Sequence, residues 1–185
     1  WVRCLLGFSS TKPGKVLKSG FNTSISNISE NIKVQWLNGG SSVWMQEILL
    51  NNPMQKINTS WAVCEDLIFS FPLGKQYPLY VCTGAKVEIE EVIMDSQSKE
   101  FYSNRGKLMY LMGLYFVLQN KDLSRIHFII NKFLYLTALF VKGIFFINTN
   151  NFYLAIGIIR AFFSSKRVLF GFQTVDEFKF EFIDS

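Results

Sequence analysis

The amino-acid sequence predicts an α/β fold whose mixed N-terminal part is followed by basic, largely apolar helices. Up to about residue 100, strand-like and helix-like segments alternate around a glycine turn. Beyond that point, apolar stretches of helical length are interrupted by Lys and Arg. The 49% hydrophobic content, with 19 Phe, is enough for a packed core and excludes a disordered tail. We therefore expect two parts, residues 1–100 and residues 101–185.

Three segments of the N-terminal part are predicted to be strands. Residues 32–37 alternate apolar and polar side chains, which is typical of a half-buried strand. Residues 77–82 and 85–90 are also strand-like, and the second places its apolar and charged side chains on opposite faces. Residues 1–35 contain glycines and a Ser/Asn-rich run, so we expect them to be loosely structured with some strand.

Two short helices are predicted between these strands. Residues 43–50 form the first, with Ser41 or Ser42 as its N-cap. Residues 65–73 form the second, closed by Gly74. The glycine loop before the first helix is either a plain connection or a place where a ligand approaches the backbone closely.

Two adjacent acids, Glu65 and Asp66, open the second helix. On a surface such a pair is an ordinary helix start, and that interpretation stays open. Here, however, the pair is framed by large apolar residues: Trp61, Val63, Leu67, Ile68 and Phe69. A carboxylate where apolar side chains meet a helix N-terminus is a candidate for chemistry.

The basic charge of the chain is concentrated in one region. Residues 102–168 carry nine Lys/Arg and one Asp/Glu, whereas residues 1–101 carry nine of each. Nucleic acid, an anionic membrane surface and an acidic substrate are the usual partners of such a region. Nucleic acid is disfavoured, because Arg is scarce and the surroundings are too apolar for a surface that follows phosphates.

Three helices are expected in this basic region, at residues 107–120, 121–148 and 151–163. Charges interrupt each stretch, so none matches the roughly 20 apolar residues of a membrane span. They suit helices that lie in a membrane interface, or a helical layer packed on the α/β part.

On a helix, the side chains of Lys121, Arg125 and Lys132 fall within roughly 40° of one another. This spacing predicts a basic stripe that faces lipid headgroups if the helix lies in the interface. In the packed alternative, the lysine stems run along the apolar surface of the layer.

The remaining features indicate structure or compartment rather than chemistry. Residues 170–185 alternate aromatic and charged side chains, which predicts a terminal strand. The one histidine, His127, lies among apolar helix residues and indicates packing. Three Cys without metal-ligand or disulfide spacing indicate reduced thiols in the cytosol. Trp1 opens the chain in mid-pattern without a signal peptide, which indicates a fragment.

The order of these motifs resembles the C-terminal half of family-2-type inverting glycosyltransferases with the GT-A fold. A Gly39-Gly40 loop precedes a helix, the Glu65-Asp66 pair follows about 25 residues later, and a strand leads to Ala85-Lys86-Val87. The similarity covers roughly residues 15–91. It implies that residues 1–100 are the C-terminal portion of a catalytic domain of the GT-A type, and that residues 101–185 are amphipathic, membrane-associated helices with a strand-like tail.

The resemblance assigns roles to individual residues. Asp66 would be the general base that takes the proton of an acceptor hydroxyl, and Glu65 would orient the acceptor or hold the helix. The donor-sugar and acceptor pocket would be lined by four residues: Trp36, Gly39, Gly40 and Ser41. Glycine permits close approach, and an indole offers a face on which a sugar stacks.

The resemblance also implies partners and a cofactor. The partners are a nucleotide-sugar donor, a glycan or lipid-linked acceptor of the bacterial cell envelope, and an anionic membrane surface, with no nucleic acid. The location is cytoplasmic, peripheral at the inner face of the cell membrane. A divalent metal, Mg²⁺ or Mn²⁺, is expected from the family, although the Asp-x-Asp that would bind it is absent from this sequence. We therefore expect this chain to be inactive alone.

A different class of function stays open. In a non-catalytic membrane-surface or interaction module, Glu65-Asp66 is only a helix start and the two glycines are only a turn.

Overall fold

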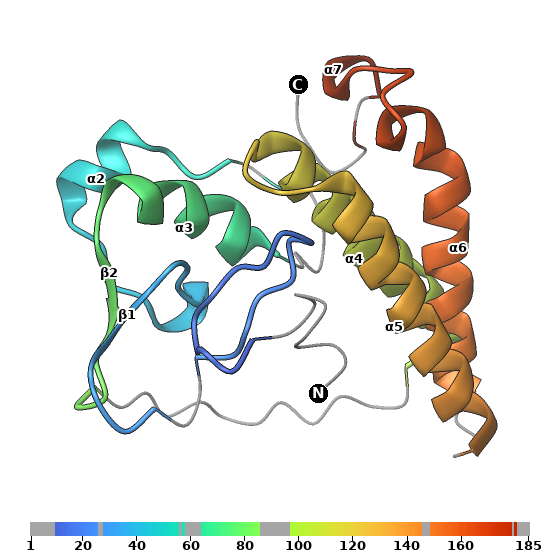
Figure 1. The fold of residues 1–185 in the computed structure, drawn as a ribbon, viewed down its shortest axis with the longest axis horizontal. Coiled ribbons are helices and arrows are strands. Elements are labelled where there is room, and N and C mark those ends of the chain that lie inside the picture. The colour runs from blue at the N-terminus through green and yellow to red at the C-terminus, as the bar shows by residue number, and fades with distance from the viewer. Residues whose placement is uncertain are drawn as a thin grey trace.

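A computed structural model describes residues 10–25, 28–55, 57, 64–85, 97–145, 149–178 and 180. Three long helices and a short C-terminal helix form one side of the molecule, and the other short helices and the strands form the other side (Figure 1). The first part contains β1 (Ile32–Val34), the 3-10 turn η1 (Gly39–Ser41), α2 (Gln46–Asn51), α3 (Glu65–Gln76) and β2 (Leu79–Val81). The second contains α4 (Lys99–Gln119), α5 (Arg125–Phe145), α6 (Thr149–Leu169) and α7 (Val175–Phe178).

The predicted α/β fold of the GT-A type is wrong, because the described chain is mostly helical. Its one sheet consists of β1 and β2, three residues each, paired antiparallel with Ile32 opposite Val81. The predicted strand at 32–37 stops early because Gln35 bonds to the N-terminal loop instead of a further strand. Its N–H donates to the Gly14 carbonyl at 2.8 Å, and its Oε1 accepts from the Val16 N–H at 2.7 Å. Of the third predicted strand, residues 86–90 lie outside the described residues.

The three predicted helices of the basic region are confirmed, each somewhat displaced from its expected bounds. α4 begins at a Ser98 cap, whose hydroxyl accepts from the Phe101 N–H at 3.1 Å. α4 supplies much of the core, including Met112, Leu114 and Phe116.

α4 and α6 cross so closely that glycine is needed at the contact. A Cβ on Gly106 would overlap the Leu154 carbonyl, and a Cβ on Gly157 would overlap the Ser103 carbonyl. Backbone against backbone leaves little room for adjustment. The crossing therefore fixes how α4 and α6 pack.

The short helices differ from their predicted bounds. α2 begins at Gln46, and its N-cap position is Met45 rather than a serine. α3 begins at Glu65 as predicted but runs past Gly74 to Gln76. Gly74 packs instead of ending the helix, since a Cβ there would lie 2.7 Å from the Gln35 carbonyl oxygen.

The predicted terminal strand is wrong over its described part, because residues 175–178 form α7. A reciprocal cap accounts for this helix: Thr174 N–H donates to Glu177 Oε2 at 2.8 Å, and Glu177 N–H donates to Thr174 Oγ1 at 3.2 Å. Phe180 follows and is buried against Tyr115, with ring centroids 5.3 Å apart. Residues 179 and 181–185 lie outside the described part.

The predicted basic stripe is incomplete, because Lys121 and Arg125 are exposed whereas Lys132 points into the bundle. Lys121 lies in the turn before α5. Arg125 Nη1 donates to the carbonyls of Val168 and Leu169 at 3.5 Å. Lys132 Nζ donates to a main-chain carbonyl of α4 at 3.5 Å. The bundle thus turns Lys132 toward its own helices, while Arg125 bonds to the end of α6 and stays exposed.

Candidate functional site

A pocket of about 570 Å³ lies between the η1–α2 segment and α3. Its wall combines carboxylates, amides and aromatic rings, and it opens to solvent. The amides come from Asn51, Asn52 and Gln76, at the ends of α2 and α3, and from Gln55 in the segment after α2. These short helices therefore place hydrogen-bonding groups around one hollow, which is the usual composition of a site for a polar ligand.

Gly39 and Asp66 meet at this pocket. Gly39 lies in η1, which is capped by the Asn38 side chain accepting from the Gly40 N–H at 3.4 Å. A Cβ on Gly39 would overlap Oδ1 of Asp66, so the carboxylate lies directly against the Gly39 main chain. Glycine at this position is thus what lets the first turn of α3 approach the loop.

α3 begins in an unusual way, with Cys64 at its N-cap position in the left-handed region at φ +70°. The Cys64 side chain makes no capping hydrogen bond. Burial raises the pKa of the Cys64 thiol, with Lys132 opposing and Asp66 adding to the rise. A non-glycine residue in this conformation costs free energy, which the surrounding packing must offset.

Glu65 and Asp66 both lie in the first turn of α3 and both line the pocket. Partial burial raises the pKa of the Glu65 carboxyl, and the neighbouring Asp66 raises it further. Two acids this close disfavour each other's charge, while the N-terminal dipole of α3 favours negative charge.

Ser70 links the two walls of the pocket. It is buried one turn into α3, and its hydroxyl accepts from the Leu37 N–H at 3.0 Å. Its proton faces two acceptors, the carbonyls of Leu37 and Asp66. Because Leu37 leads into η1, this hydroxyl fixes the loop that carries Gly39 relative to the helix that carries Asp66.

An indole lines the pocket, but it is Trp44 rather than the predicted Trp36. Trp44 packs edge-on to Phe69, with centroids 5.1 Å apart, and its Nε1 donates to Ser42 Oγ at 2.9 Å. Trp36 is buried in the core beside α3, where its Nε1 donates to the Thr23 carbonyl at 3.2 Å. Trp44 is therefore the tryptophan that is placed to contact a ligand in this pocket.

Three of the six predicted site residues come together at the pocket: Gly39, Glu65 and Asp66. The other three, Trp36, Gly40 and Ser41, do not line it. The prediction missed Trp44, Phe69, Ser70 and the amides. Trp44 could have been found as the first aromatic residue after the glycine loop, whereas Ser70 gave no local signal.

The described residues contain no group of three or more His, Cys, Asp or Glu side chains that could hold a metal ion. Glu65 and Asp66 are two carboxylates on consecutive positions of one helix, without a third ligand beside them in this part of the chain. They do not fit the Mg²⁺ or Mn²⁺ site expected from the resemblance. His127 lies on α5, where its Nδ1 is 2.9 Å from Ser124 Oγ, and it does not line the pocket.

The pocket thus brings a carboxylate pair, a close-packed glycine and an indole to one hollow. No family model, curated protein or solved structure matches the chain.

Proposed function

We propose that the pocket binds a sugar-bearing acceptor and that Asp66 acts as general base in glycosyl transfer from a nucleotide-sugar donor. One observation carries the proposal: Asp66 is held against Gly39 at the wall of an open pocket that also presents an indole. The proposal concerns this chemistry and does not depend on a GT-A fold.

The transfer step needs one proton acceptor. The acceptor hydroxyl oxygen attacks the anomeric carbon and forms a new C–O bond, while the bond to the donor phosphate breaks and its electrons leave with the nucleoside diphosphate. The hydroxyl proton passes to the Asp66 carboxylate as the attack proceeds. Attack from the face opposite the leaving group inverts the configuration at the anomeric carbon.

The other groups of the pocket suit a carbohydrate. Trp44 offers an apolar face for a sugar ring, and Asn51, Asn52 and Gln76 offer amide donors and acceptors for hydroxyl groups. Glu65, whose pKa is raised by burial and by Asp66, binds a second hydroxyl in either protonation state.

The proposal is tested by measuring nucleoside diphosphate release by the protein. The probes are UDP-glucose, UDP-galactose, UDP-N-acetylglucosamine and GDP-mannose, each with water or simple glycosides as acceptor. Asp66→Asn keeps the shape but loses the base, so release should fall by about 10²- to 10⁴-fold. Gly40→Ala is the matched control, because a Cβ there meets no atom within 4 Å. Unchanged release in Asp66→Asn would show that Asp66 is not the base.

A second candidate is a non-catalytic membrane-surface or interaction module. It is favoured by a separate observation, the row of exposed apolar side chains along α5. Diphosphate release by the wild-type protein separates the two candidates. A membrane-surface or interaction module releases no diphosphate from any of the four donors, whereas the enzyme releases it from at least one.

A further inference from the structure

One face of α5 is an apolar stripe that is exposed along the whole helix. We define the α5 stripe by six side chains that are 40–68% exposed: Ile126, Ile130, Phe133, Phe140, Val141 and Ile144. At 100° per residue these positions fall within an arc of about 100°, and they extend over about 27 Å. The stripe is therefore one continuous surface rather than a set of scattered side chains.

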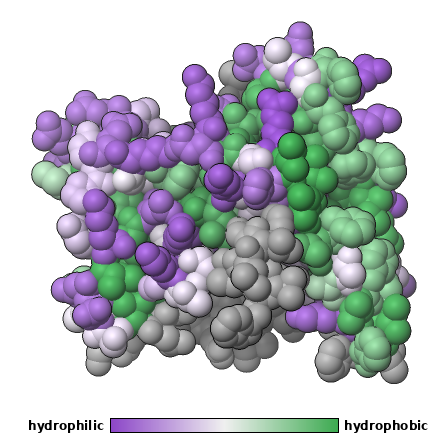
Figure 2. Space-filling view, viewed as in Figure 1, coloured by the Kyte–Doolittle hydropathy of each residue, from purple (hydrophilic) through white to green (hydrophobic). Residues whose placement is uncertain are grey.

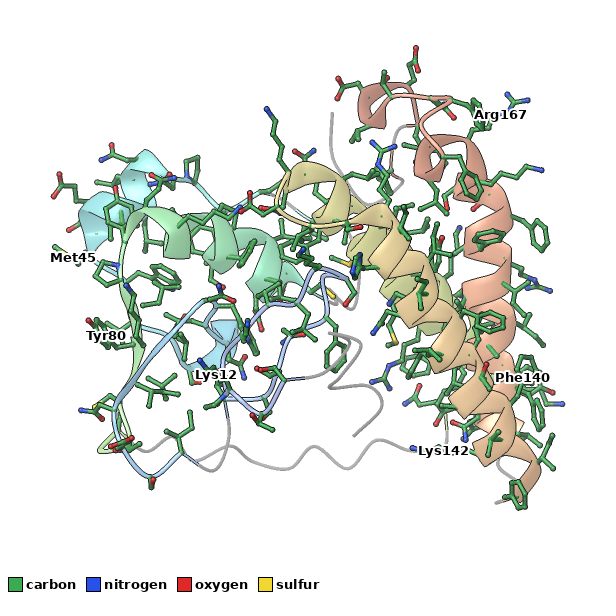
Figure 3. All side chains as sticks on the ribbon, in the orientation of Figure 1. Lys12, Met45, Tyr80, Phe140, Lys142 and Arg167 are labelled. Carbon is green, nitrogen blue, oxygen red and sulfur yellow. The ribbon has the colours of Figure 1, made fainter. Side chains whose placement is uncertain are left out.

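The α5 stripe presents no polar group that needs water. Thr137 lies within it, but the Thr137 hydroxyl donates to the Phe133 carbonyl at 3.0 Å and is satisfied inside the helix. The opposite side of α5 packs on the bundle through Phe128, Leu139 and Gly143. In Figure 3, Phe140 and Lys142 lie on opposite sides of the helix. α5 thus packs on the bundle along one narrow side and is exposed along the other.

An apolar hollow of about 260 Å³ extends this surface onto α6. Phe133 of the stripe lines it from α5, and Phe163 lines it from α6. Both rings are largely exposed, 67% for Phe133 and 61% for Phe163. Figure 2 shows hydrophobic residues gathered over α5, while hydrophilic residues predominate over α2 and α3. Such a patch on a protein surface marks an interaction site.

The charges around this surface select its partner. α5 and α6 together carry six Lys or Arg and no Asp or Glu. Arg160 and Arg167 stand three residues before and four residues after Phe163, so they share its face of α6, and both are exposed. A second copy of the chain would bring two basic surfaces together, whereas an anionic bilayer attracts them.

We propose that the α5 stripe and Phe163 dock this chain on an anionic lipid bilayer, with α5 parallel to the membrane surface. α5 is the one helix of the described chain that is long and apolar enough to cross a bilayer. Its inner face, however, packs on α6, whose exposed Arg160, Lys166 and Arg167 would enter hydrocarbon in a spanning arrangement. In the interfacial arrangement the apolar rings insert and these cations stay at the headgroups.

Docking in this way leaves the candidate pocket accessible. The stripe lies on the three-helix side of the molecule, and the pocket lies beside α2 and α3 on the other side (Figure 1). The inference does not depend on the proposed sugar chemistry, because none of the pocket residues belongs to the docking surface.

Vesicle flotation of the full chain tests the proposal, without any donor or acceptor sugar. The probes are vesicles of phosphatidylcholine alone and of phosphatidylcholine mixed with phosphatidylglycerol. The wild-type protein should float with the mixed vesicles, and the double variant Phe133→Ser/Phe140→Ser should bind at least about tenfold more weakly. Tyr80→Ser, which removes an exposed aromatic ring from β2, is the matched control and should bind like the wild type.

A second pair of variants tests the role of charge. Arg160→Gln/Arg167→Gln should weaken binding to the mixed vesicles and flatten its dependence on salt. Circular dichroism checks that every variant keeps its helices. Equal wild-type binding to both vesicle types, or unchanged binding of the Phe133→Ser/Phe140→Ser variant, would overturn the proposal. So would a wild-type dimer that this double variant converts to a monomer, since the stripe would then bind a second copy.

Discussion

The Asp66 carboxylate lies against the main chain of Gly39, although 26 residues separate the two in sequence. The contact joins the 3-10 turn η1 to the first turn of α3. It leaves no room for a side chain at residue 39, so the position of the carboxylate and the identity of residue 39 depend on each other.

Gly39→Ala should lower nucleoside diphosphate release by about 10²-fold. The new methyl group would displace the Asp66 carboxylate, and a shift of about 1 Å in a catalytic group can cost that much activity. The measurement is the same release assay. Gly40→Ala has open space around its Cβ and should retain wild-type release. Equal effects of the two alanines would mean that the contact has no part in activity.

Ser70→Ala should lower the free energy of unfolding by about 1–3 kcal/mol, because it removes the partner of a part-buried Leu37 N–H. Urea denaturation followed by circular dichroism measures this change. Ser164→Ala is the control: its hydroxyl also bonds within a helix, to the Ala161 carbonyl, but the residue is exposed. Its effect should stay within about 0.5 kcal/mol. If Ser70→Ala and Ser164→Ala lowered the free energy of unfolding equally, Ser70 would not link the two walls of the pocket.

Tyr110→Phe should raise the free energy of unfolding by about 1 kcal/mol at neutral pH, because it removes a buried hydroxyl that has no hydrogen-bond partner. Tyr110 is 1% exposed. The nearby Ser165 hydroxyl donates to the Ala161 carbonyl at 2.7 Å, and no hydrogen bond of normal geometry joins it to the Tyr110 oxygen. Urea denaturation of the wild type and of Tyr110→Phe gives the difference in free energy of unfolding. A lower value for Tyr110→Phe would contradict this prediction.

Tyr110 should also make the free energy of unfolding depend on pH in the alkaline range. Burial raises the pKa of Tyr110 from 10.0 to about 12. Between these values the folded chain keeps a proton that the unfolded chain releases, so stability falls as pH rises, by up to about 1.4 kcal/mol per pH unit. Tyr110→Phe should show a shallower fall over this interval. Parallel stability curves for the two proteins would refute the assignment.

Gly157→Ala should destabilise the bundle by about 3 kcal/mol, because the methyl group would overlap the Ser103 carbonyl where backbone packs on backbone. Gly84→Ala meets no atom within 4 Å and serves as the control. Thermal unfolding should show a clearly lower midpoint for the first variant and an almost unchanged one for the second. Similar midpoints would mean that α4 and α6 can move apart at little cost.

Part of the candidate site could be predicted from sequence because it depends on neighbours along the chain. The acid pair at the start of α3 and the glycine loop are local signals, and the pocket contains Gly39, Glu65 and Asp66. Trp36 was misassigned because its burial depends on Thr23 and the core beside α3, which no local pattern reveals. Ser70 was missed for the same reason, since its partner Leu37 lies 33 residues away.

The three long helices follow from local sequence alone, because apolar length and the 3.6-residue period act between near neighbours. Which side of each helix faces solvent depends instead on tertiary packing. This packing turns Lys132 toward a neighbouring helix and leaves the apolar stripe of α5 outside. The extent of the predicted sheet also depends on tertiary contacts, because a strand needs hydrogen-bond partners that are distant in sequence. Gln35 bonds to the loop at Gly14 instead of extending β1.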